Sequence, residues 1–252
     1  MKAALRIGAV ATGAALALGA VGSAYAATPG ANSTASAKAT ASGAKGKAAS
    51  AHATATGLAA VQKLATSRIE GRLSTLHALS LAVGDSKYLT SGEQGTLGKQ
   101  ISSDVSGLTA LDSKVAGAMT VQDVRADEVA MVDDFRVYLL MAPQVRLTEG
   151  LAAESDAATT LQKAYVALSA LLAKQSGGGT AAQKSELADL QSQTTAAQAA
   201  IGNEVASVLA IQPGPNASAI HSALAPAASA VKTARADLLK ARDDAEALRA
   251  SL

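Results

Sequence analysis

The sequence has 252 residues, with 22 basic and 20 acidic side chains, and it contains no cysteine. A chain without cysteine forms no disulfide and offers no thiolate ligand or nucleophile, so a hydrophobic core must stabilise it. The small net charge provides no long-range attraction for nucleic acid. Aromatic residues make up 2% of the chain, and alanine dominates the apolar fraction. We therefore expect helix propensity to contribute much of the stability.

Residues 1–26 have the features of a cleavable secretion signal. Lys2 and Arg6 precede a largely apolar stretch over 7–20, and Ala24-Tyr25-Ala26 is a small-residue cleavage motif. The apolar stretch is shorter than the roughly 20 residues that span a bilayer. We expect a secreted protein, extracellular or associated with the cell wall, with no stable membrane insertion after cleavage. Loss of the two basic residues would leave it with no net charge.

Residues 27–56 differ from the rest of the chain in composition. They are a mixture of Ala, Ser, Thr, Gly and Lys with no aliphatic side chain larger than alanine. Such a segment buries too little apolar surface to offset the entropy of ordering, so we expect a disordered linker. It is either a solvated tether or, through Lys38, Lys45 and Lys47, a contact to an anionic cell wall.

From residue 57 onward the apolar residues recur at helical spacing, which predicts an all-α fold over 57–252. The predicted helices are 57–83, 91–117, 121–176 with a kink at Pro143, 181–210 and 217–251. Thr90 with Glu93, Thr120 with Asp123, and Thr180 with Gln183 have the spacing of capping boxes at three helix starts. The short connections favour an antiparallel bundle of about five long helices with coiled-coil-like, alanine-rich seams.

The sequence contains no pattern typical of catalysis or cofactor binding. It has no P-loop, dinucleotide fingerprint or G-x-S-x-G elbow. Its histidines, His52, His77 and His221, are too dispersed for the paired spacing of a zinc helix. We expect no enzyme activity, no cofactor and no metal site.

Three acidic residues on the third predicted helix leave one alternative open. Asp123, Asp127 and Asp134 lie within about 40° of one another at 100° per residue. Such a group could bind calcium, or it could be a solvated acidic face near a helix N-terminus, which the helix dipole favours. The second interpretation is preferred.

Three charged residues interrupt the apolar faces: Arg72 on the first helix, Asp104 on the second and Glu128 on the third. An isolated buried charge is costly, so each requires a partner. A hairpin of the first two helices brings Arg72 and Asp104 to similar heights, which predicts an ion pair between them. Arg68 is a possible partner for Glu128. We prefer the interpretation that these charged residues set the register of the helices over the interpretation that they form a functional polar pocket.

The segment Arg125–Pro143, with the sequence RADEVAMVDDFRVYLLMAP, resembles the central stretch of secreted helical proteins of unknown function from actinobacteria. Arg72-Leu73 and Leu108-Thr109-Ala110-Leu111 match the hairpin before it, and Ala241–Ala245 matches more loosely. The resemblance covers about residues 57–147. It implies fold and export, but no activity.

These features favour a secreted interaction or scaffold protein of the cell envelope, whose partner is a protein or the cell wall. The alternative is an extracytoplasmic carrier that holds an amphipathic or lipid-like ligand between helices. The heptad pattern over 217–251 is compatible with packing inside the chain or with pairing to another copy.

Overall fold

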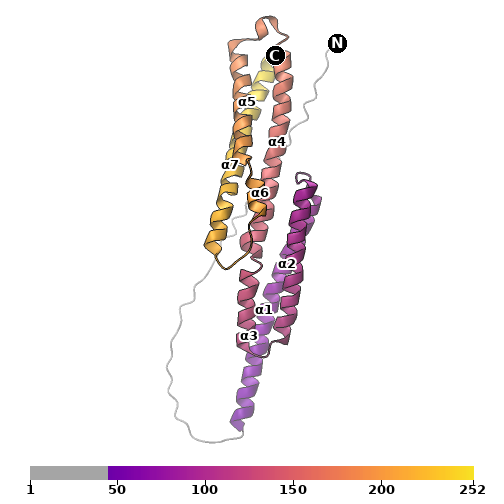
Figure 1. The fold of residues 1–252 in the computed structure, drawn as a ribbon, viewed down its shortest axis with the longest axis vertical. Helices are drawn as coiled ribbons and strands as arrows, with labels where there is room; N and C mark the ends of the chain where they lie inside the picture. The colour runs from indigo at the N-terminus through magenta and orange to yellow at the C-terminus, as the bar shows by residue number, and fades with distance from the viewer. Residues whose placement is uncertain (1–44) are drawn as a thin grey trace. The chain divides into compact units, whose positions relative to one another are not determined.

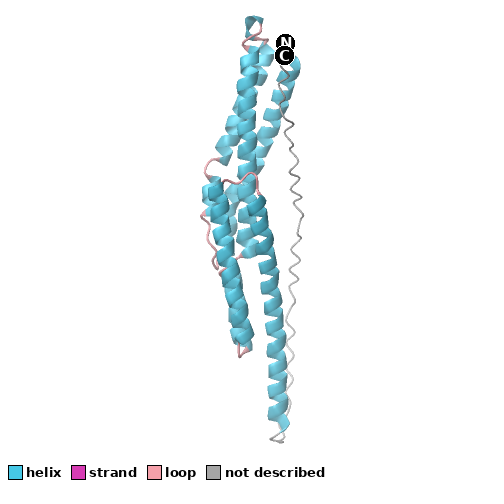
Figure 2. Ribbon diagram, turned by 90° about the vertical axis from the view of Figure 1, so that its right-hand side faces the viewer, coloured by secondary structure: helices cyan, strands magenta, loops and turns pink. Residues whose placement is uncertain are grey.

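The computed structural model describes residues 45–252, with side chains from residue 56 onward. Helices and short turns make up this part of the chain, which has no strand (Figure 2), so the all-α prediction is confirmed. The elements are α1 (Lys45–Asp85), α2 (Ser91–Gly117), α3 (Val121–Asp133), the π-helix η1 (Val137–Met141), α4 (Ala142–Leu172), the 3₁₀ turn η2 (Ser176–Gly178), α5 (Ala181–Ile201), α6 (Glu204–Leu209) and α7 (Ala217–Ser251).

The three predicted capping boxes are present. Thr90 begins α2, and its backbone N–H donates to Glu93 at 2.7 Å while its hydroxyl accepts from the Glu93 N–H. Thr120 with Asp123 and Thr180 with Gln183 form the same reciprocal contacts at the starts of α3 and α5. Each box satisfies two backbone donors that the first helical turn leaves without partners.

The prediction of a disordered linker over 27–56 is wrong in its last part, because α1 already begins at Lys45. Alanine is the strongest helix former, and extending an existing helix adds one hydrogen bond for each residue that is ordered. An alanine-rich segment that adjoins a packed helix can therefore extend it without a hydrophobic face of its own. Residues 27–44 of the predicted linker and the predicted signal peptide lie outside the described residues.

The helix predicted over 121–176 is broken, but not at Pro143. The break lies at 134–136, where Arg136 adopts φ 43°, and η1 follows it. Pro143 lies in the first turn of α4. This first turn continues directly from η1, where the N–H of Ala142 donates to the carbonyl of Val137, five residues earlier. The proline, which lacks an N–H, therefore directly follows a turn with π-helical hydrogen bonding.

The helix predicted over 181–210 is also two helices. Gly202 ends α5 with φ 41°, and α6 begins at Glu204. Glycine adopts positive φ without the clash that a Cβ atom would cause.

Residues 56–252 form one compact unit with two hydrophobic clusters. The first cluster joins α1, α2 and α3 to η1 and the first part of α4. The second lies among α4, α5, α6 and α7, of which α4, α5 and α7 run side by side (Figure 1). Five alanines of the second cluster are completely buried: Ala158, Ala197, Ala227, Ala234 and Ala241. Close packing of helices therefore relies on alanine, as the sequence indicated.

Candidate interaction surface

Two valines of α3 are open to solvent among charged side chains. Val124, Asp127 and Met131 form the buried face of this helix. On the other side, Val129 is 60% exposed and Val132 is 38% exposed. Burial of such side chains against a partner is favourable, because it removes apolar surface from water.

A shallow, open hollow accompanies these valines. Its lining consists of Arg125, Glu128, Val129, Val132 and Asp133, all on α3. A hollow on a single helix presents an outward face to another molecule rather than an enclosure for one. The hollow does not provide the enclosed apolar site that the predicted carrier role needs.

Charged side chains surround the valines on α3. Arg125 is exposed towards the N-terminus of the helix. Towards the C-terminus, Asp133 accepts from Arg136 at 2.7 Å. Glu128 accepts from Arg68 of α1 across the first cluster, which confirms the predicted partner for Glu128. Both acidic residues of this face are therefore paired with arginines, Glu128 with Arg68 and Asp133 with Arg136.

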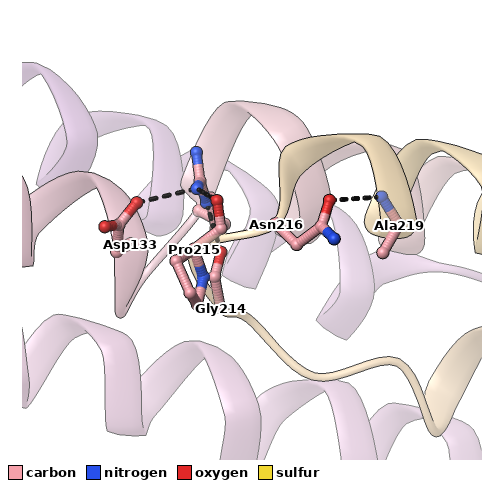
Figure 3. A network of polar contacts seen from close by, with 6 residues as sticks. Asp133, Gly214, Pro215, Asn216 and Ala219 are labelled. Atoms are coloured by element: carbon pink, nitrogen blue, oxygen red, sulfur yellow. Dashed lines mark hydrogen bonds and ion pairs between the residues drawn. The ribbon is translucent and has the colours of Figure 1, made fainter.

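The C-terminal end of α3 is held by Arg136, whose side chain is 9% exposed. Its Nε donates to the carbonyl of Gly214 at 2.8 Å, and its Nη2 donates to the carbonyl of Pro215 at 2.7 Å. Figure 3 shows Gly214, Pro215 and Asp133 gathered at this contact, beside the Asn216 cap of α7. The guanidinium neutralises Asp133 while it binds the loop that precedes α7.

Two glutamines attach the end of α6 in a similar way. Gln144 of α4, which is fully buried, donates to the carbonyl of Val208 at 2.8 Å. Gln100 of α2 donates to the carbonyl of Leu209 at 3.1 Å. Both carbonyls belong to the last turn of α6, and the Val208 carbonyl also accepts from the backbone N–H of Ile211 at 3.2 Å. The segment 208–215 is therefore bound through its backbone by Arg136, Gln100 and Gln144, and we call these contacts the carbonyl clasp.

The structure places Arg72 beside an aromatic ring. Its guanidinium carbon lies 5.2 Å from the centroid of the Tyr138 ring, and its Nη1 donates to the carbonyl of Arg68 at 3.0 Å. The first contact is a cation–π interaction. The position of Arg72 on an apolar helix face predicted a charged partner and did not indicate this aromatic one. The predicted ion pair between Arg72 and Asp104 stays a prediction.

Burial raises the pKa of Asp104 to about 6, because desolvation disfavours the carboxylate. Burial is the dominant influence on the pKa of this carboxyl. The half-buried carboxyl is therefore a source of pH-dependent stability.

The acidic residues of the predicted stripe have separate structural contacts. Asp123 caps α3 through Thr120, and the buried Asp127 pairs with Lys114 of α2 at 2.6 Å. Asp134 is exposed beyond the end of the helix. Within residues 56–252, no three His, Asp or Glu side chains gather in a way that would hold a metal ion. These contacts favour the structural interpretation of the stripe over calcium binding.

The sequence interpretation missed the exposed valines of α3, although their signal was present. Val129 lies about 140° around the helix from Val124, at 100° per residue, and so on the opposite side. Val132 lies about 80° around the helix from Val124, and it is 38% exposed. The clasp residues carried no comparable signal, because their partners are backbone carbonyls far along the chain.

No helix among residues 45–252 has the length and apolar character needed to span a membrane. Comparisons of the chain with protein families, with curated proteins and with solved structures found no match.

Proposed function

We propose that this protein is a secreted interaction protein of the cell envelope, without catalytic activity, and that α3 presents its apolar face to a protein partner. The observation that carries this proposal is the exposure of Val129 and Val132 on a helix whose other face is packed in the core. The proposed architecture is a helical bundle, exported by the signal features of residues 1–26.

The other polar groups support a role in binding rather than in chemistry. Arg136, Gln100 and Gln144 are engaged with backbone carbonyls, and Glu128 is engaged with Arg68. A catalytic centre needs polar groups that converge on a substrate in a cleft. In the part of the chain that the structure describes, these side chains instead hold helices and loops in position.

Secretion is supported by the sequence of the first 26 residues and by the resemblance to secreted helical proteins of actinobacteria. The N-terminal sequence of the protein recovered outside the cell tests it. The expected first residue is Ala27, and intact protein retained in the cytoplasm would contradict the proposal.

Proximity labelling in the envelope tests the interaction role, with a labelling enzyme fused to the C-terminus. The chain with Val129→Asp should lose labelled proteins that the parent retains, because a carboxylate at the centre of the surface is costly to desolvate. Val166→Asp on α4 is the matched control, since Val166 is 59% exposed and Val129 is 60% exposed. The same labelling pattern for parent and both variants would contradict a role of α3 in binding.

A further inference from the structure

Two side-chain amides meet the last turn of α6 from two different helices. Gln144 of α4 donates to the carbonyl of Val208, and Gln100 of α2 donates to the carbonyl of Leu209. These carbonyls are consecutive along the chain, so both amides lie at the same end of a helix of six residues. Val208 belongs to the second hydrophobic cluster, whereas Leu209 packs against the first. The two amides therefore lie where the clusters adjoin.

The orientation of both amides follows from their partners. A backbone carbonyl only accepts hydrogen bonds, so each glutamine turns its Nε2 towards the carbonyl and leaves its Oε1 for another partner. The Oε1 atoms of Gln100 and Gln144 are both buried, and no hydrogen-bond donor among the described residues reaches either atom. Gln144 as a whole is fully buried, so bulk solvent does not reach its oxygen.

Both amide oxygens need a hydrogen-bond donor in the folded chain. A buried acceptor without one has lost the hydrogen bonds that water provides in the unfolded chain, which is unfavourable. Most buried polar groups are partnered by protein or by ordered water. Two acceptors at the same turn call for a small molecule that donates twice, and water is such a molecule.

We propose that one buried water molecule bridges Gln100 and Gln144 at the end of α6 and donates one hydrogen bond to each Oε1 atom. The water links α2 to α4 beside the backbone of α6. It completes the part of the carbonyl clasp that lies between the two hydrophobic clusters. This site is separate from the α3 surface, so its test does not depend on the proposed binding role.

The groups at this site favour water over a metal ion. Calcium takes about six to eight oxygen ligands, usually with carboxylates among them. Here two neutral amide oxygens are available, and the N–H groups of the same amides would repel a cation. Within residues 56–252, His, Asp and Glu side chains form no group of three that could hold a metal ion.

A crystal structure of the chain, at a resolution that shows ordered water, tests the site directly. One water oxygen should lie about 2.7–3.2 Å from both Oε1 atoms. Two separate waters, a direct hydrogen bond between the two amides, or no ordered water at this site would overturn the bridge. An ion with ligands at about 2.3–2.6 Å would overturn it as well.

Oxygen-17 relaxation dispersion counts the waters that the protein holds for longer than it takes to tumble. The double variant Gln100→Leu with Gln144→Leu should hold one such water fewer than the parent. Gln191→Leu, at an exposed position on α5, should hold the same number as the parent. An unchanged count in a folded double variant would contradict the proposal.

A shared water also couples the two glutamines energetically. Once Gln144→Leu has removed one side of the bridge, Gln100→Leu should shift the urea midpoint by less than about half of its shift in the parent. In the Gln191→Leu background, Gln100→Leu should give its full shift. Equal shifts of Gln100→Leu in the parent and in Gln144→Leu would show that the two amides act independently, which overturns a single bridging water.

Discussion

The guanidinium of Arg136 donates to the backbone carbonyl of Gly214, which lies 78 residues further along the chain, at 2.8 Å. This contact links the break after α3 to the loop that precedes α7. Arg136 itself has φ 43°, a backbone conformation that costs free energy in any residue with a Cβ atom. The side-chain hydrogen bonds of Arg136 therefore stabilise the same residue whose backbone conformation costs free energy. The gain from these bonds offsets the backbone cost.

Replacement of Arg136 should separate these two effects. Arg136→Ala keeps the positive φ, removes the side-chain donor from the carbonyls of Gly214 and Pro215, and removes the ion pair of Asp133, while Pro215 still accepts from the N–H of Ala217 at 3.1 Å. We therefore expect the free energy of unfolding to fall by about 2–4 kcal/mol. Arg136→Gly also loses the side chain but relieves the backbone, and it should be about 1 kcal/mol more stable than Arg136→Ala. Urea denaturation measures both variants.

The exposed Arg146 on α4 provides the control for Arg136. Arg146→Ala should change the free energy of unfolding by no more than about 0.5 kcal/mol. If Arg136→Ala is equally mild, water replaces the side chain at the two carbonyls and the clasp contributes no net stability.

The buried contact of Gln144 with Val208 should hold α6 in place. Gln144→Leu introduces an apolar side chain of similar size and removes the side-chain donor, so the Val208 carbonyl keeps only its backbone contact with the N–H of Ile211. We expect a loss of about 1–3 kcal/mol and faster hydrogen exchange of the α6 amides. Gln191→Leu, at an exposed position on α5, should leave exchange in α6 unchanged, and unchanged exchange in Gln144→Leu would show that apolar packing alone holds α6.

The features that were predictable from the sequence are those whose causes are local. Thr120 and Asp123 are three residues apart, and their reciprocal hydrogen bonds depend on that spacing alone. The end of α3 has a different kind of cause. Nothing near Arg136 indicates a left-handed residue, because its partners, the carbonyls of Gly214 and Pro215, are supplied by tertiary structure.

The sequence led to a wrong prediction where one residue was compatible with two local structures. Pro143 predicted a kink or a short break at its own position, but the break lies at 134–136, and Pro143 follows the π-helix η1 within continuous helical backbone. Gly202 lies within a helical pattern, where an isolated glycine is often tolerated, yet here it ends α5. The angular position of Val129 around the helix already indicated that its side chain is exposed on α3. The candidate surface was therefore more predictable from the sequence than the carbonyl clasp that supports it.

Two glycines of α2 should respond in opposite ways to the same substitution. A Cβ atom on Gly107 would overlap the ring of Phe135, whereas one on Gly98 meets no atom within 4 Å. Gly107→Ala should therefore lower the free energy of unfolding by about 1–3 kcal/mol, because the ring must move. Gly98→Ala should raise it by about 0.5–1 kcal/mol through helix propensity. Thermal melting of both variants measures the difference, and stabilisation by both would show that Phe135 rotates away at little cost.

Asp104 should make the free energy of unfolding depend on pH between its pKa in the unfolded chain and its pKa in the folded chain. Its pKa rises from 3.8 to about 6 in the folded chain because burial disfavours the charged form. The folded state thus binds the proton more tightly than the unfolded state. The contribution of Asp104 is fully present below pH 3.8, falls as the pH rises towards 6, and is constant above that.

Asp104→Asn should therefore be more stable than the parent at pH 7.5, by roughly 1 kcal/mol after allowance for solvent screening of a half-exposed carboxyl. The difference should shrink towards zero near pH 4, where the parent carboxyl is also neutral, and denaturation in urea at both pH values measures it. Asp156→Asn, at an exposed position on α4, should show no such pH-dependent gain. A parent that is more stable than Asp104→Asn at pH 7.5 would mean that the carboxylate has a favourable partner, as the predicted Arg72 pair requires.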